Sequence, residues 1–278
     1  MSQAIRVQWA NETVRICQDG GYLASSGRTV SFAGEIERAR TGTVMYSLES
    51  PPPSAMRTRS GRTYIEVRNE TTFEALRRLV DGIGHVACLN FASAKNPGGG
   101  FLSGAQAQEE ALARSSALYP CLLRAPDYYE RNRANHSAIY LDLLIFSPLV
   151  PFFRDDSGAL LETPILASVI SAPAPNAGAL SESEPGNMVL LEPALRRRAE
   201  LVLQTAQGHE VDKLVLGAWG CGVFRNDPRM VARIFSELLS LPGFFDRAFA
   251  EVVFAVFDRA EPQATYKAFV EVFGNAGI

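Results

Sequence analysis

Two patterns of apolar residues, one typical of strands and one typical of helices, alternate along most of the chain. From Thr63 onward, short apolar runs typical of strands are followed by segments in which apolar residues recur at helical spacing. The strand-like runs are TYIEVRN, HVACLNFA, PILASVISAPAP, DKLVLGAWG and EVVFAVFD, and AIYLDLLIFSPLVPFFR is expected to hold two more strands. The helical segments are TTFEALRRLVDG, EPALRRRAELVLQTAQGH, DPRMVARIFSELLS and EPQATYKAFVEVF, with a further helix after the glycines at 98–100. This alternation predicts an α/β fold whose mixed or parallel sheet is covered by helices on both faces.

The first 62 residues have a different pattern. TVRICQDGGYLASSGRTVSF alternates around Asp19, Gly20 and Gly21, which predicts a hairpin, and SPPPSAMRTRSGR reads as an exposed connection. We therefore expect residues 1–62 to be an N-terminal extension packed on a main domain of residues 63–278. Farther along, SAPAPNAGALSESEPGNM is expected to be a long polar loop over a site.

Composition narrows the function classes. The 278 residues are 47% hydrophobic and 21% charged, as in ordinary globular proteins. A net charge of −3 argues against sequence-specific nucleic-acid binding. Any polyanionic ligand would therefore have to be bound by a local group of residues and not by the overall charge. The chain begins without the basic and apolar regions of a signal peptide and has no long apolar run, so we expect a cytoplasmic protein with no membrane contact.

Cysteines and histidines show no metal-binding pattern. The four cysteines lack CxxC spacing, and the three histidines, His85, His136 and His209, stand alone and are expected to be structural or solvated. We therefore expect no metal and no other cofactor.

Two glycine-rich stretches follow predicted strands: LNFASAKNPGGG and LGAWGCGVFRNDP. Ligands of open α/β sheets bind at the carboxyl ends of strands, and glycines let backbone N–H groups cradle an anion there. Two such loops facing each other would suit a diphosphate, although each could also be a tight strand-to-helix turn. The first loop lacks the Lys-Ser/Thr of a P-loop, and no GxGxxG marks a Rossmann site.

Two adjacent glutamates, Glu109 and Glu110, follow the first loop. Neighbours on a helix point about 100° apart, so the two cannot flank one bond as the paired carboxylates of most glycosidases do. One would carry out proton transfer and the other would orient substrate hydroxyls; the alternative is two surface glutamates in a first turn. The helix is expected to begin between Ser103 and Gln108, with a capping box from Ser103 to Gln106.

These motifs together resemble a known signature. Gly98, Gly99 and Gly100, then seven residues, then Gln108, Glu109 and Glu110 are similar to the GGG-x(6-8)-QEE signature of poly(ADP-ribose) glycohydrolases of the bacterial type, and GAWGCGVF matches the diphosphate loop of that family. The resemblance implies a three-layer α/β/α macrodomain with a mixed central sheet, from about Thr63 to the C-terminus, and an N-terminal extension.

The resemblance also implies an activity: metal-independent hydrolysis of the ribose–ribose O-glycosidic bonds of poly(ADP-ribose), mainly from the chain end, to release ADP-ribose. By position, Glu110 would be the catalytic acid/base and Glu109 would hold ribose hydroxyls. Partners would be poly(ADP-ribose), ADP-ribose and ADP-ribosylated proteins, and a monomer is expected. The substrate-binding set would be Gly98, Gly99 and Gly100 at the distal ribose and its phosphate, Gln108 in the signature, Gly220, Cys221, Gly222 and Val223 at the diphosphate, and Phe224 on the distal ribose.

Several further candidate residues could have a purely structural role instead of a functional one. Asn90 and Asn96 could anchor ribose hydroxyls or could serve only their loop. Phe257 could stack on adenine or be a buried core ring. Cys221 is read as a small loop residue because no histidine accompanies it as a base. Thr265 and Tyr266 could border the groove. Arg196–Arg198 could contact the phosphates of a polymer, but the favoured interpretation is an exposed basic helix face.

Two other functions remain open for such a chain. One is a macrodomain reader that binds ADP-ribose without cutting it, for which the pair Glu109 and Glu110 would have no use. The other is an enzyme that removes the last ADP-ribose from a protein side chain. Isolated polymer and mono-ADP-ribosylated protein, offered as separate substrates, distinguish these functions.

Overall fold

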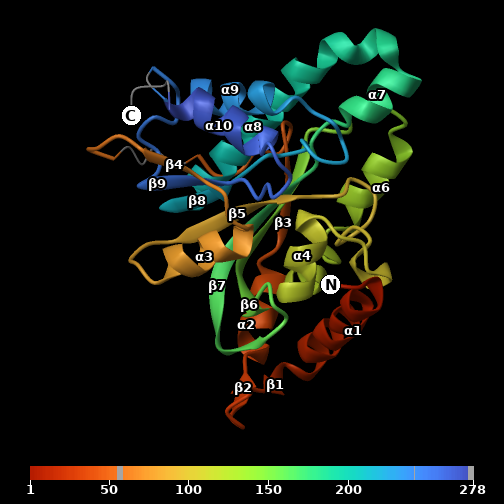
Figure 1. Ribbon diagram of the computed structural model, residues 1–278, viewed down its shortest axis with the longest axis vertical. Helices are drawn as coiled ribbons and strands as arrows, with labels where there is room; N and C mark the ends of the chain where they lie inside the picture. Colours follow the sequence, from red (N-terminus) through yellow and green to blue (C-terminus); the bar gives the residue numbers. More distant parts are fainter. Residues whose placement is uncertain (55–58, 241, 275–278) are drawn as a thin grey trace.

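The computed structural model describes residues 1–54, 59–240 and 242–274 (Figure 1). The strands are β1 (Gly21–Leu23), β2 (Thr29–Ser31), β3 (Val44–Ser47), β4 (Tyr64–Arg68), β5 (Val86–Phe91), β6 (Leu143–Arg154), β7 (Leu160–Ala172), β8 (Lys213–Leu216) and β9 (Glu251–Ala255). The helices are α1 (Gln3–Asp19), α2 (Ala33–Thr41), α3 (Thr72–Val80), η1 (Phe101–Ser103), α4 (Gln108–Ser115), α5 (Leu118–Leu122), α6 (Pro126–Ala134), α7 (Ala177–Ser183), η2 (Pro185–Leu190), α8 (Leu191–Gly208), α9 (Pro228–Leu239) and α10 (Ala264–Gly274).

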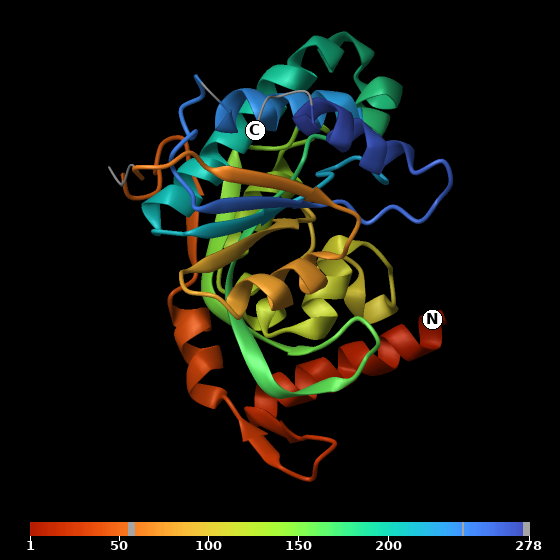
Figure 2. The same cartoon turned by 60° about the vertical axis from the view of Figure 1, so that its left-hand side comes forward.

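A seven-stranded mixed sheet forms the centre, in the order β3-β6-β7-β5-β8-β9-β4. The pairs β3–β6 and β6–β7 are antiparallel, and the pairs from β7 through β5, β8 and β9 to β4 are parallel. Helices α8, α9 and α10 cover one face, and α3 and α4 lie on the other (Figure 2). The three-layer α/β/α architecture with a mixed sheet is therefore confirmed.

Each central strand contributes to both cores because it is buried on both faces. In β5, Ala87 and Leu89 pack with α8 and α9, whereas Val86 and Cys88 pack with α3 and α5. Side chains of a strand alternate between faces, so a continuous apolar run is what such a strand requires. The parallel strands thus end together at one edge, where the glycine-rich loops begin.

The N-terminal region differs from the expected hairpin. Residues 13–19 belong to α1, which ends at Gly20 with φ 72°, and the hairpin is instead β1 and β2 around residues 24–28. The prediction was wrong there because Gly20 is the left-handed cap of a helix and not the centre of a turn. Strand β3 pairs with β6 in the main sheet. The boundary at residue 62 stays a prediction.

Two other segment predictions were wrong. The run after Ala138 forms one strand, β6, interrupted by register shifts between Ser147 and Val150 and between Phe152 and Arg154, and not two strands. Pro148 lies within the first register shift, and both prolines of this strand lie beyond the stretch that pairs with β3. The expected polar loop at 171–188 contains helix α7 and most of η2, because the Asn176 side chain accepts a hydrogen bond from Ala179 N and caps α7.

In the described part of the chain, no helix has the length and apolarity needed to cross a membrane.

Candidate active site

The first glycine loop lies directly against the two glutamates. Gly98 and Gly99 have φ of 69° and 59°, a region that favours glycine. A Cβ on Gly99 would lie 2.3 Å from Glu110 Oε1 and 3.1 Å from Glu109 Oε2. Gly100 N donates a hydrogen bond to Glu110 Oε1 at 3.0 Å. The loop backbone therefore approaches both carboxylates as closely as only glycine allows.

Helix α4 begins at Gln108 without the expected capping box. Its N-cap residue, Ala107, has no side-chain cap, and the Ser103 hydroxyl donates to Gly100 O in η1. Gln108 instead fixes the helix start. Its Oε1 accepts from Phe91 N at 2.9 Å, and its Nε2 donates to Leu89 O at 2.8 Å and to Thr72 Oγ1 at 3.1 Å. One side chain thus joins α4 to β5 and α3.

Glu109 and Glu110 occupy unequal environments. Glu109 is 2% exposed; its Oε2 accepts from Ser93 N at 2.7 Å and its Oε1 from Asn90 Nδ2 at 3.2 Å. Burial raises the pKa of Glu109 to about 8, against the lowering effect of these two donors and with a smaller raising effect of nearby Glu110. Glu110 is partly exposed. The alternative of two surface glutamates is therefore wrong for Glu109.

The two predicted asparagines differ in position. Asn90 is fully buried, and its Nδ2 also donates to Ser171 Oγ at 3.0 Å, so its contacts hold Glu109 in place. Its Oδ1 is buried without a hydrogen-bond partner among the described residues. Asn96 is exposed, and its carbonyl accepts from Gly99 N at 3.0 Å.

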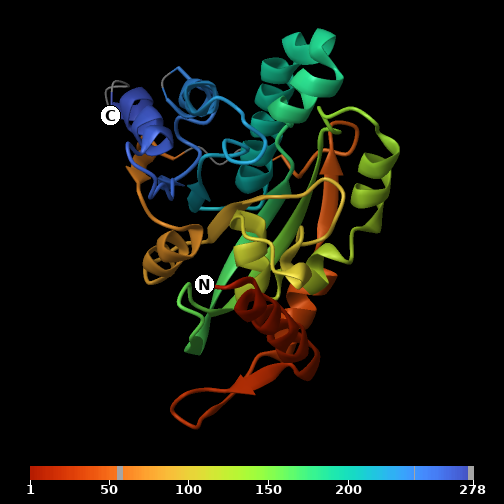
Figure 3. The same cartoon turned by 45° about the vertical axis from the view of Figure 1, so that its right-hand side comes forward.

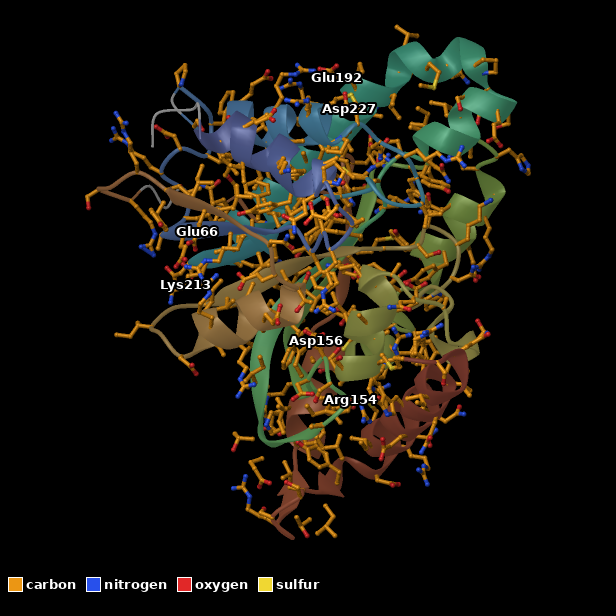
Figure 4. All side chains as sticks on the ribbon, viewed as in Figure 1. Glu66, Arg154, Asp156, Glu192, Lys213 and Asp227 are labelled. Carbon is orange, nitrogen blue, oxygen red and sulfur yellow. The ribbon has the colours of Figure 1, made fainter. Side chains whose placement is uncertain are left out.

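The second glycine loop follows β8 and is anchored from both sides. Gly220 has φ 74°, and a Cβ there would lie 2.3 Å from Asn226 Nδ2. Asn226 Nδ2 donates to Pro175 O at 2.9 Å, and Asp227, labelled in Figure 4, caps α9 through Arg229 N. Gly222 has no neighbour within 4 Å of a Cβ. Packing within the protein therefore requires glycine at position 220. At position 222 it does not, because a Cβ there would lie in open space.

Three further residues of this loop face different surroundings. Val223 is 83% exposed, and the ring of Phe224 lies 6.1 Å from that of Tyr140. Burial raises the pKa of the Cys221 thiol, and the negative charge of Asp227 raises it further. A raised pKa disfavours the thiolate, which fits the interpretation of Cys221 as a loop residue and not a nucleophile.

A cleft of about 730 Å³ opens at this edge of the sheet. That volume is within the range of small-ligand sites. Of the predicted residues, those that line it are Gln108, Gly220, Cys221, Gly222, Val223, Phe224, Phe257 and Thr265. The two glutamates, the first glycine loop, Asn90 and Asn96 are not among the lining residues, but Gln108 and Ala111, which flank the glutamates on α4, are.

Sequence reasoning missed one wall of the cleft. Thr71 and Glu74 form a capping box at the start of α3, and Thr71 Oγ1 donates to Asp156 Oδ2 at 2.5 Å. Figure 4 shows Asp156 between α3 and α4. The T-x-x-E spacing after a strand was a readable sign of a helix start at this edge. No sequence pattern around Asp156 indicates that it lies at the cleft, because only the folding of the β6–β7 turn places it beside Thr71.

Phe257 and Arg259 form another wall. Phe257 is 50% exposed, so the alternative of a buried core ring is wrong. The Arg259 guanidinium carbon lies 4.6 Å from the centre of the ring, within cation–π distance. Thr265 lies in the cleft, whereas Tyr266 packs against the core.

The basic cluster on α8 is not the exposed face that was expected. Arg198 is fully buried and donates to Asp142 and to the carbonyl groups of Pro173, Ile139 and Tyr140. Arg197 also pairs with Asp142. The expectation was wrong for Arg198 because a carboxylate and three carbonyl groups compensate the buried charge. Within the described ranges, no group of three or more His, Cys, Asp or Glu residues could hold a metal.

Comparison with known proteins agrees with this geometry. Residues 10–155 match the family model described as the catalytic domain of microbial-type PARG. The structure is similar to poly(ADP-ribose) glycohydrolase from Thermomonospora curvata, with a TM-score of 0.91 and 46% identity over 97% of this chain and 100% of that one. The same enzyme bound to the inhibitor ADP-HPD matches with a TM-score of 0.88 and 46% identity over 96% and 99% of the two chains.

A second organism gives a related match. Poly(ADP-ribose) glycohydrolase from Deinococcus radiodurans in complex with ADP-ribose has a TM-score of 0.81 and 46% identity, over 90% of this chain and 100% of that one. No curated protein matches the chain. The family match over more than half of the chain and the full-length structural matches show that the chain belongs to the microbial-type poly(ADP-ribose) glycohydrolases.

Proposed function

We propose that this chain hydrolyses the ribose–ribose O-glycosidic bonds of poly(ADP-ribose), mainly from the chain end, and releases ADP-ribose. The observation that carries the proposal is the unequal pair under the glycine loop: Glu109 buried and held by Ser93 and Asn90, and Glu110 partly exposed and held by Gly100 N. Burying a carboxyl group is costly. A reader that only binds ADP-ribose would have no use for this arrangement.

The chemistry requires one group that gives and then takes a proton. Glu110 protonates the 2′-oxygen of the neighbouring unit as the bond from C1″ to that oxygen breaks, and an oxocarbenium ion forms. The diphosphate beside it stabilises the positive charge. Glu110, now anionic, removes a proton from water, whose oxygen bonds to C1″, and the acid is regenerated. The Gly100 N–H fixes the orientation of the carboxyl group through both steps.

The surrounding residues would hold the terminal unit. Glu109, whose pKa burial raises, would hold ribose hydroxyls through hydrogen bonds. Gly98–Gly100 would bind the distal ribose and its phosphate, and Gly220–Val223 the diphosphate. Phe224 would pack on the distal ribose, and Phe257 on adenine. For Asn90, which is fully buried, support of Glu109 is the better assignment, while Asn96 on the exposed loop keeps its predicted contact with ribose.

Several finer assignments belong to the same proposal. ADP-ribosylated proteins would be partners through their polymer chains. A cytoplasmic monomer with an N-terminal extension of residues 1–62 and a catalytic domain of residues 63–278 is proposed on the same grounds.

The test is Glu110→Gln. Because general acid–base catalysis contributes about 10²- to 10⁴-fold, release of ADP-ribose from isolated polymer should fall by at least about 100-fold. Titration calorimetry with ADP-ribose should give a Kd close to that of the wild type. Glu130→Gln, at an exposed position on α6, is the matched control and should keep full activity.

Two results would reject the proposal. One is substantial polymer cleavage by Glu110→Gln. The other is a wild-type protein that leaves isolated polymer intact but removes a single ADP-ribose from a modified protein, which would favour the mono-ADP-ribosyl hydrolase.

A further inference from the structure

The segment that leads into α4 is held from outside. Gly104, with φ 79°, ends η1, and Ala107, the N-cap residue of α4, offers no side-chain cap. Residues 104–107 lead into α4 and, together with the Gln108 side chain, fix where the helix begins and where Glu109 and Glu110 point. Within the segment, Ala105 N donates to Gly100 O at 3.0 Å. Much of the remaining support comes from α1.

Helix α1 lies along this segment (Figure 3). Arg6 Nε donates to Gly104 O at 2.6 Å, and Gln3 Nε2 donates to Ser103 O at 2.9 Å. A Cβ on Gly104 would lie 2.9 Å from both Gln3 Cγ and Gln3 O. The two backbones are therefore in direct contact, with no space between them.

The C-terminal end of α4 also contacts the segment before the helix and helix α1. Arg114, one helical turn after Glu110 and 4% exposed, donates from Nη1 to Ala105 O at 2.7 Å. Its own carbonyl accepts from Thr13 Oγ1 at 2.5 Å and from Arg154 Nε at 3.3 Å. Helix α1 thus contacts the segment before α4 through Arg6 and the last turn of α4 through Thr13.

Arg6 is suited to hold the segment rigidly. Its Nη1 donates to Met1 O at 2.8 Å while its Nε reaches Gly104 O, so two contacts fix the plane of one guanidinium group. Arg6 does not line the cleft. Any effect of Arg6 on the reaction must therefore pass through the residues it holds: Gly104 in the segment before α4, or Met1, which lines the cleft.

We propose that Arg6 is a positioning residue for Glu110: by holding the Gly104 carbonyl it fixes the segment that leads into α4 and, with Gln108, the placement of the Glu110 carboxyl group. The inference rests on the proposed role of Glu110. It assigns a task in the reaction to the first turns of α1, in the part of the chain that precedes the family match at residue 10.

The test uses Arg6→Ala, Arg6→Lys and Arg15→Ala in the full chain. Arg15 is an exposed arginine on the same helix and is the matched control. Since a misplacement of about 1 Å can cost about 10²-fold in rate, we expect Arg6→Ala to lower kcat roughly 10- to 100-fold. KM for polymer and the Kd for ADP-ribose should change less than about twofold, because Arg6 is outside the cleft. Arg6→Lys, which keeps a donor for Gly104 O, should recover part of the lost kcat, and Arg15→Ala should behave as the wild type.

Gln3→Ala provides a second, milder perturbation of the same segment. Gln3 is exposed, so the variant should fold, and kcat should fall by a few-fold with KM unchanged. Normal kcat in Arg6→Ala would overturn the inference, and so would an equal loss of ADP-ribose affinity, which would indicate general damage to the site. If the wild type is active, Glu110→Gln inactive and Arg6→Ala normal, only this inference fails; an inactive wild type would reject the proposed function itself.

Discussion

Replacing Gly99 by alanine perturbs the candidate active site at one defined contact. The backbone at Gly99 has φ 59°, and placing alanine in this region costs about 1–2 kcal/mol of folding free energy. The new Cβ would also lie 2.3 Å from Glu110 Oε1, whereas ordinary van der Waals contact begins at 3.4 Å. The carboxyl group must therefore move by about 1 Å, which breaks its hydrogen bond with Gly100 N.

The expected result combines a modest loss of stability with a large loss of rate. Unfolding in urea should show a free energy of unfolding lower by about 1–2 kcal/mol. Release of ADP-ribose from polymer should fall by about 10²-fold, because a shift of about 1 Å in a reacting group has that effect.

Gly27→Ala separates the two causes. Gly27 also has a positive φ, 81°, but nothing lies within 4 Å of a Cβ there. We expect a similar loss of stability with unchanged activity. The reasoning is refuted if Gly99→Ala keeps more than a third of the wild-type rate, or if Gly27→Ala loses activity to the same degree.

Two further predictions concern the buried carboxyl group and the exposed ring. Because the pKa of Glu109 is raised from 4.5 to about 8, the folded state binds more protons than the unfolded state between these values; stability contributed by Glu109 therefore falls as pH rises, by about 1.4 kcal/mol per unit. Urea unfolding of wild type and Glu109→Gln from pH 5 to 7.5 should show a difference in free energy with this slope, and a flat difference would contradict it. Phe257→Ala should weaken ADP-ribose binding roughly 5- to 150-fold in calorimetry, as expected for the loss of one stacked base, with little change in stability because the ring is half exposed; an unchanged Kd would remove Phe257 from the site.

The sequence predicted the elements whose pattern is decided locally. Strand β5 and helices α3, α8 and α9 follow from uninterrupted apolar runs and helical spacing, since each faces a core along its length. Helix α1 was misread because it buries only Ala10, Thr13 and Ile16, too few for a clear period, and because Gly20 and Gly21 resembled a turn.

The site was predictable where glycines mark strand ends and was not where distant segments meet. The two loops could be found because close backbone approach requires glycine at Gly99 and Gly220. The burial of Arg198 depends on Asp142, 56 positions away, and the placement of Asp156 depends on its contact with Thr71, 85 positions away. No local pattern encodes such pairs, so the basic cluster was expected on the surface and the Asp156 wall was not expected at all.

The adjacency of glycines and glutamates expresses a single geometric requirement. Successive residues on a helix diverge by about 100°, so in the first turn of α4 one carboxyl group turns toward Ser93 and Asn90 in the interior and the other toward the peptide of Gly100. Burial raises the pKa of the first, while the second remains partly exposed, as the proposed proton-transfer role of Glu110 requires. The loop can lie over both groups only if Gly99 has no side chain, because one Cβ there would contact Glu109 and Glu110 together. Two different carboxyl environments therefore arise from neighbouring residues, and the glycine loop is what makes their separation possible.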